Sequence, residues 1–285
     1  MNNRELVCFL KIVENKYSFE NDCCEIEQTL DAMRMYLMYP IYKDWNLASH
    51  DYRTGSWKLN APNGTETLTA DVLTSIRQAV AGALEKSIPQ EFKGVHIVKA
   101  IVDNPFYNIC NDVGKRTKLN VEQNKEAIKA FASVVYWIGN MLPVPNSYSP
   151  GPSGKQDTWY FKMKYILNIL YGIEDTKHAW DIWRKSWKNK PKEFINGNYL
   201  QDMVEEKDGE KDRKFYVKDY APKGESWFIE NTKLIIQRSY RIVYQFSEDW
   251  NDSAKDEENV KSIMQYVFKQ AGFNETKAKN LATIF

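Results

Sequence analysis

Apolar residues recur three and four positions apart over much of the chain. Between residues 22 and 39 the repeat consists of Ile26, Leu30, Met33 and Leu37. This spacing places side chains on one face of a helix, which Pro40 ends because proline lacks the backbone donor. The same spacing predicts helices at residues 121–138, 159–170, 180–187 and 227–246 and, after an acidic linker at 249–258, two more towards Phe285.

The helical pattern is interrupted after Pro40. Residues 42–64 mix aromatic and polar residues and close on the turn signal Asn63-Gly64, which indicates an irregular segment or a short hairpin. Thr69 and Asp71 then predict the start of a helix that runs towards Pro89. Gly94–Val102 fits either a buried strand or the core of a helix, because so short an apolar run does not separate the two.

Two later segments are mostly polar. Residues 196–202 predict a turn that leads into a helix, and the alternating charges from Glu205 to Lys214 favour a solvated loop. Asn198 and Asp202 lie four positions apart, on one face if helical. They are suited to binding a cation or to capping a helix, and capping is the more frequent role.

Helical periods far outnumber alternating ones, so we expect a mainly α protein. The prediction is a single large helical domain over residues 1–285, with a minor irregular or β element near residues 42–64. Alternatively, residues 255–285 form a separate C-terminal helical appendage to this domain.

The composition narrows the class of protein. Its 43% hydrophobic and 14% aromatic residues exclude a disordered chain, and the net charge of +1 gives no global attraction to nucleic acid or an anionic membrane. The four cysteines have no spacing typical of zinc ligands, so we expect no metal and no cofactor. The chain has no apolar run near the ~20 residues that span a bilayer and no signal peptide pattern, so we expect a cytoplasmic protein.

A loop rich in proline and glycine joins two apolar helices between Trp137 and Lys155. Ordered long loops often carry binding groups, although a rigid connector explains the same residues. We identify Asn140, Asn146 and Lys155 as candidate binding residues because they offer donors suited to an anion. The nearby Trp180, Trp183 and Trp187 share a helix face and favour core packing over ligand binding.

The segment His50-Asp51-Tyr52-Arg53-Thr54 gathers an imidazole, a carboxylate, a guanidinium and a hydroxyl. These groups suit acid–base work or phosphate capture, so His50, Asp51 and Arg53 are the candidate catalytic residues. An internal ion pair of Arg53 with a carboxylate is the alternative explanation.

Three segments together carry a resemblance: Asp51-Tyr-Arg-Thr, Ile138-Gly-Asn-Met-Leu-Pro-Val-Pro, and Phe194 to Val204. From Tyr42 to Phe246 the chain resembles an uncharacterised bacterial and phage family known only as a domain of unknown function. The resemblance implies a mostly helical cytoplasmic protein. Gly55 and Ser56 replace the acidic residue and proline-rich stretch that follow the Arg-Thr pair in that family.

These features support two hypotheses for function. The first is a non-enzymatic interaction protein with a protein partner, in bacterial defence or phage counter-defence, because aromatic residues are many and no catalytic motif occurs. The alternative is a hydrolase or transferase that acts on a nucleotide or nucleic acid through Asp51, Arg53 and Lys155. Nucleic acid is the less favoured partner, and its best local candidates are Lys185, Lys188, Lys190 and Lys192.

Overall fold

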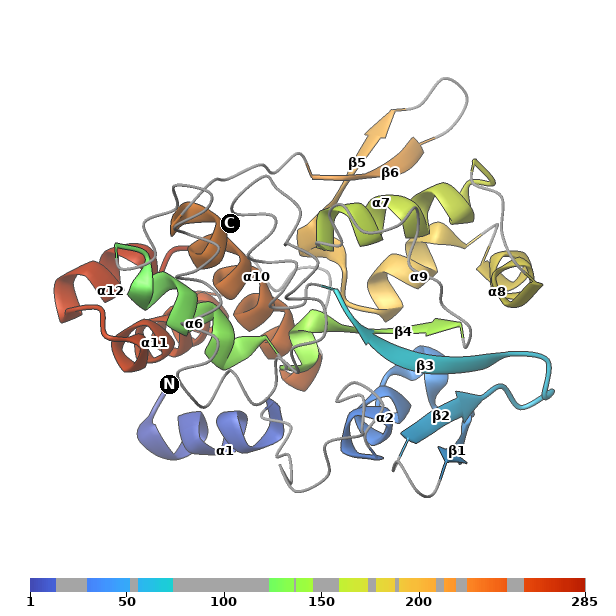
Figure 1. Cartoon of the computed structure of the whole chain (residues 1–285), viewed down its shortest axis with the longest axis horizontal. Coiled ribbons are helices and arrows are strands. Elements are labelled where there is room, and N and C mark those ends of the chain that lie inside the picture. The colour runs from blue at the N-terminus through green and yellow to red at the C-terminus, as the bar shows by residue number, and fades with distance from the viewer. Residues whose placement is uncertain are drawn as a thin grey trace, which may run out of the picture.

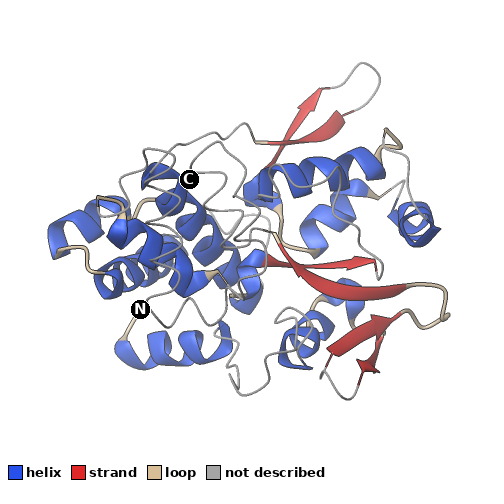
Figure 2. Cartoon of the chain, viewed as in Figure 1, coloured by secondary structure: helices blue, strands red, loops and turns tan. Residues whose placement is uncertain are grey.

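The structure is a computed structural model, and helices make up most of it (Figure 2). It describes residues 1–13, 30–51, 56–73, 123–135, 137–145, 159–173, 178–187, 190–208, 213–218, 225–244 and 254–284. The predicted mainly α fold with a minor β element is confirmed. The segments predicted as a helix towards Pro89 and as either strand or helix at Gly94–Val102 lie outside these ranges.

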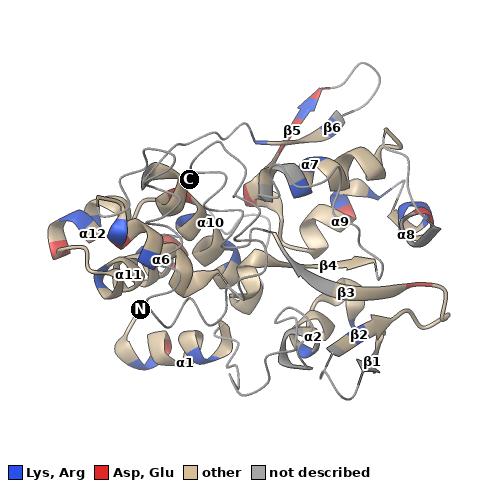
Figure 3. Ribbon diagram, viewed as in Figure 1, with Lys and Arg blue, Asp and Glu red and all other residues tan. Residues whose placement is uncertain are grey.

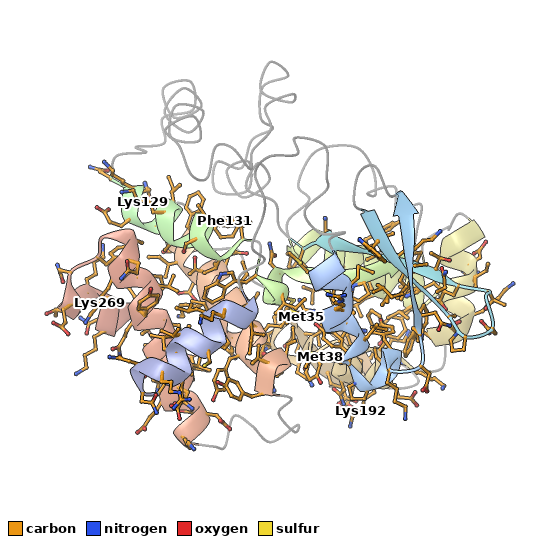
Figure 4. The ribbon with its side chains drawn as sticks, turned by 90° about the horizontal axis from the view of Figure 1, so that it is seen from below. Met35, Met38, Lys129, Phe131, Lys192 and Lys269 are labelled. Atoms are coloured by element: carbon orange, nitrogen blue, oxygen red, sulfur yellow. The ribbon has the colours of Figure 1, made fainter. Side chains whose placement is uncertain are left out.

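The longest helix, α10 (Glu225–Tyr244), is the centre of a group of helices. It packs on α6 (Lys125–Val134), α11 (Ala254–Ala271) and α1 (Asn3–Val13), and α12 (Glu275–Leu281) packs on α11. Both termini lie on this side of the molecule (Figure 1). In the view of Figure 4, Lys129 and Lys269 mark this helical group, whereas Lys192 lies on the opposite side of the molecule.

A four-stranded antiparallel sheet forms much of the other side (Figure 1). Its strands follow the order β1 (Asn46–Asp51), β2 (Ser56–Asn60), β3 (Thr67–Val72) and β4 (Met141–Pro145). The hairpin predicted near residues 42–64 is therefore present as β1 and β2.

The helix predicted to start at Thr69 and Asp71 is wrong, because both residues lie in β3. Thr69 pairs with Val144 and Asp71 with Leu142 in the ladder with β4. The start of the Pro-rich segment is likewise a strand rather than a loop. Proline is tolerated in β4 because this strand is at the edge of the sheet, where a missing donor costs no ladder bond.

Helix α2 (Leu30–Leu37) continues into a short 3-10 helix, η2 (Pro40–Tyr42). It ends before Pro40 as predicted, and Met33, Tyr36, Tyr39 and Tyr42 are buried at a spacing of three. Tyr39 packs edge-on against both Tyr36 and Tyr199, with ring centroids 5.5 and 5.2 Å apart. This aromatic row joins the sheet side of the molecule to the later turn that contains Tyr199.

Three helices lie beside the sheet: α7 (Trp159–Leu170), α8 (His178–Trp187) and α9 (Pro191–Gly197). A 3-10 helix, η5 (Gln201–Met203), then leads into the antiparallel ribbon of β5 (Val204–Asp208) and β6 (Arg213–Val217). The loop predicted from Glu205 to Lys214 is therefore wrong for the described residues, which form two strands, although Glu206, Lys207 and Asp208 are exposed as predicted. The ribbon is anchored from one side, since the backbone N–H of Phe215 donates to the Tyr171 hydroxyl at 2.8 Å.

A buried polar row on α10 connects these parts. The guanidinium of Arg238 is fully buried and donates to the carbonyls of Gly139, Met141, Asn198 and Tyr199 at 2.7–3.3 Å. Burial lowers the pKa of Arg238 below its ordinary value. One side chain thus satisfies carbonyls from two segments that would otherwise be unpaired in the core.

The segment before β4 approaches α10 closely. Gly139, in the 3-10 helix η4 (Ile138–Asn140), donates its N–H to the Ser239 hydroxyl at 3.0 Å. A Cβ on this residue would lie 2.1 Å from the carbonyl oxygen of Ile235. Only glycine permits this approach without displacing the backbone of one of the two segments.

Candidate functional site

A shallow pocket of about 460 Å³ lies where the β2–β3 turn meets η2 and the junction of α8 with α9. Its wall combines aromatic, aliphatic and ionisable residues: Ile41, Trp45, Ala61, Pro62, Asn63, Thr65, Glu66, Ser186, Trp187, Lys190 and Glu193. Three stretches of the chain, at residues 41–45, 61–66 and 186–193, therefore contribute its described lining.

The β2–β3 turn forms one lip of the pocket. Pro62 and Asn63 occupy its centre, and Gly64 has a positive φ of 68°, a conformation that glycine adopts without strain. The Asn63 side-chain oxygen accepts from the backbone N–H of Thr65 at 3.1 Å and from its hydroxyl at 2.7 Å. The backbone N–H of Ala61 donates to the carbonyl of Glu66 at 2.8 Å, which closes the turn. The local sequence thus fixes the lip.

Helices α8 and α9 form the opposite wall. Trp183 is buried and packs edge-on against Phe194, with ring centroids 5.1 Å apart. Trp187, one turn later, is half-buried and packs on the same Phe194 at 5.5 Å. The predicted core role is therefore correct for Trp183, whereas Trp187 also lines the pocket. The side chain of Trp180 lies outside the described part of the structure.

Glu66 is the buried ionisable group of the pocket, with only 7% of its surface exposed. The Ser186 hydroxyl lies 3.2 Å from Oε2 of Glu66 and 3.3 Å from the carbonyl of Ile182, so two acceptors compete for one proton. Oε1 of Glu66 is shielded from solvent and has no hydrogen-bond partner in the described ranges. Burial raises the pKa of Glu66, and the Ser186 hydroxyl opposes this shift by favouring the ionised form.

A second unpaired polar atom belongs to another residue that lines the pocket. The indole N–H of Trp187 is buried and finds no acceptor among the residues that the structure describes. Buried polar groups are nearly always paired, so two unpaired groups lining one pocket mark it as incomplete.

The sequence placed candidate binding residues elsewhere, at Asn140, Asn198 and Asp202. All three are buried and bonded within the protein: Asn140 donates to the carbonyl of Val135 at 2.7 Å, and Asn198 donates to that of Phe194 at 3.0 Å. Asn198 and Asp202 do not share a helix face, because Asn198 ends α9 and Asp202 lies in η5. Asn198 thus caps α9, and its side-chain oxygen accepts from Tyr42 at 3.1 Å. A role in binding an outside ligand stays a prediction for all three.

The other sequence candidates cannot be placed as side chains. His50 and Asp51 lie in β1, but only their backbone is described. Arg53, Asn146 and Lys155 lie outside the described ranges. The approach of the catalytic candidates to Lys155 stays a prediction.

Sequence reasoning missed Glu66 and the arginines of α10. Glu66 follows a turn signal, which gives no sign that α8 will cover it, since Ser186 is 120 positions away. For Arg238 and Arg241 a signal existed: both lie among the apolar positions of a long helix, where a charged residue is buried only when paired.

Charged residues and metal-binding side chains indicate no second candidate site elsewhere in the described segments. Basic and acidic residues are interspersed over the described helices and strands of the molecule (Figure 3). Lys185, Lys190 and Lys192 of the predicted basic group are exposed, and Lys190 lies 3.4 Å from Glu193. No three His, Cys, Asp or Glu side chains of the described residues converge on a metal-binding point. None of the helices described here is long and apolar enough to cross a bilayer.

The resemblance to a domain of unknown function stays a prediction. No family model matches the chain, and neither a curated protein nor a solved structure matches it.

Proposed function

We propose that this protein acts by binding a protein partner, and that the pocket beside Glu66 receives one projecting side chain of that partner. The observation that carries the proposal is a pocket with two half-buried tryptophans on its wall and unpaired polar atoms among its lining residues. Tryptophan is enriched among the residues that dominate binding energy at protein interfaces.

The shape of the pocket favours a macromolecule over a free small molecule. Six of its lining residues are exposed: Pro62, Asn63, Thr65, Ser186, Lys190 and Glu193. Small-molecule sites bury most of the ligand surface, which so open a pocket does not achieve. A side chain presented by a partner needs less enclosure, because the surrounding surfaces of the two proteins exclude the remaining water.

The wall of the pocket is preorganised. Pro62 restricts the backbone of the lip, and Pro191 restricts the start of α9, where a missing donor costs nothing. Trp187 is held by Phe194, and Trp45 packs edge-on against the buried Tyr42, with ring centroids 5.4 Å apart. Little side-chain freedom is lost when a partner binds, which favours affinity.

The proposal is tested by selecting a random peptide display library against the purified full chain. We expect enriched peptides whose binding is lost in Trp187→Ala and in Thr65→Trp. The second variant fills the mouth of the pocket from an exposed position and so leaves the core intact. Lys255→Trp, at an exposed position of α11 in the helical group, is the matched control.

Retained binding in Thr65→Trp would place the interaction elsewhere on the molecule. A library that yields no enriched peptide would overturn the proposal for this pocket.

A further inference from the structure

The charges of the described residues that line the pocket do not balance, and this deepens the proposed function on which the inference rests. Among the described residues, two carboxylates, Glu66 and Glu193, and one ammonium, Lys190, line it. Lys190 Nζ lies 3.4 Å from Glu193 Oε2, so these two exposed groups pair with each other. Glu66 has no cationic partner among the residues described.

The imbalance lies at the buried carboxyl group rather than at the exposed pair. Glu66 is 7% exposed, whereas the side chains of Lys190 and Glu193 are 55% and 63% exposed. An ionised carboxylate with so little exposed surface is poorly solvated, so a cation that reaches it gains more than a cation beside an exposed carboxylate would. The pocket therefore complements a positive charge.

The tryptophans of the pocket indicate which kind of cation it binds best. Trp45 and Trp187 both line the pocket, and the face of an indole ring is the best aromatic partner for a cation. A guanidinium is planar, stacks on aromatic rings and is more weakly hydrated than an ammonium. It also offers several donors, which suits the carboxylate of Glu66 as an acceptor.

We infer that the pocket binds an arginine side chain of the partner protein, with its guanidinium against Glu66 and in contact with Trp45 and Trp187. The exposed Lys185 and Lys192 do not line the pocket, and water and salt screen charges at the surface. These two lysines therefore do not remove the preference of the pocket for a cation at Glu66.

Three blocked peptides test this inference: acetyl-Gly-Gly-Xaa-Gly-Gly-amide with Xaa as arginine, citrulline or lysine. Citrulline keeps the shape and most donors of arginine but has no charge. Binding is followed from the indole N–H signals of Trp45 and Trp187 by NMR titration. We expect the arginine peptide to bind at least about tenfold more tightly than the citrulline peptide, as for a charged hydrogen bond, and more tightly than the lysine peptide.

Glu66→Gln should reduce binding of the arginine peptide to the level of the citrulline peptide. Glu257→Gln is the matched control, because it neutralises a glutamate of α11 that pairs with Lys261 at the surface. It should leave the affinity unchanged.

Two results separate failure of this inference from failure of the proposed function. Display-selected peptides that bind through the pocket but share no arginine, or equal binding of arginine and citrulline peptides, would overturn the arginine inference alone. If no selected peptide and no arginine peptide shifts the two indole signals, both fall.

Discussion

Arg241 and Asp202 form a two-point ion pair in the core. The guanidinium donates Nε to Oδ2 of Asp202 at 3.0 Å and Nη2 to Oδ1 at 2.9 Å, and both side chains are at most 6% exposed. Gln237, one turn earlier on α10, donates to the same Oδ1 at 2.9 Å. The pair fixes η5 on the central helix α10, and η5 leads directly into the β5–β6 ribbon.

Asp202→Asn should destabilise the protein by about 3–5 kcal/mol, because it leaves the Arg241 charge buried without its partner. Urea denaturation followed by circular dichroism measures this. The double variant Asp202→Leu with Arg241→Met, which removes both charges, should recover a large part of the loss. Equal losses in the single and double variants would contradict a charge-based explanation.

Arg238→Lys should cost about 2–4 kcal/mol in free energy of unfolding, because an ammonium cannot reach carbonyls on both sides of α10 and leaves some unpaired. Lys255→Arg, at an exposed position of α11, is the control for the exchange itself. The lost bonds should also show as faster amide hydrogen exchange in segments 137–141 and 196–200. An unchanged exchange pattern would show that the carbonyls of Asn198 and Tyr199 do not depend on Arg238.

Gly139→Ala should destabilise by about 3 kcal/mol or more, at the upper end of the range for overpacking, because the added methyl group meets backbone atoms. Its Cβ would lie 2.7 Å from the backbone N of Ser239 as well as close to Ile235. Gly64→Ala is a useful comparison, since open space surrounds that site and only its positive φ opposes the change. It should cost about 1–2 kcal/mol. Similar losses for the two variants would contradict the close approach of η4 to α10.

The raised pKa of Glu66 predicts a stability that depends on pH. Burial favours the neutral acid in the folded state, so the parent protein loses stability as the pH rises through the folded pKa. Glu66→Gln cannot ionise and escapes this loss. It should therefore be more stable than the parent at pH 7 by about 1 kcal/mol, the scale of one unpaired buried group, with little difference below about pH 4.

The Ser186 hydroxyl contacts this carboxyl group, Tyr42 interacts with it electrostatically, and Lys190 and Glu193 line the same pocket. Tyr42 stays neutral over this range, because burial raises its pKa. Denaturation of the parent, Glu66→Gln and Glu257→Gln across this pH range is the measurement. A Glu66→Gln variant less stable than the parent at pH 7 would show that the ionised carboxylate has a cationic partner.

The sequence predicted what short-range spacing determines. Leu30, Met33 and Leu37 marked α2, and the apolar positions after Trp227 marked α10, because a helix face is defined within a few residues. Thr69 and Asp71 looked like a helix start for the same local reasons. Their strand depends on pairing with Leu142 and Val144, more than 70 positions later, which a local pattern does not contain.

The β5–β6 ribbon was not predicted because Glu205 to Lys214 carry few apolar residues. The alternation that marks a strand is absent until Phe215 and Val217.

The site was harder to predict because it, too, depends on residues far apart in the sequence. Glu66 becomes buried only when Ser186 and Trp187 arrive from a distant helix. The turn that positions it, Pro62-Asn63-Gly64, was recognisable, but its role as the lip of a pocket was not.

The position of Arg238 late in the chain has a consequence for the order of folding. Gly139 lies 99 residues before it and Asn198 lies 40 before it. Contacts of such sequence separation form slowly, because the intervening chain must first be confined. During synthesis the segments around both carbonyls leave the ribosome before α10 does, and their carbonyls stay bonded to water until it arrives. The nascent chain therefore acquires its cross-connected core only after α10 has been made, and until then it depends on local helices and the early hairpin.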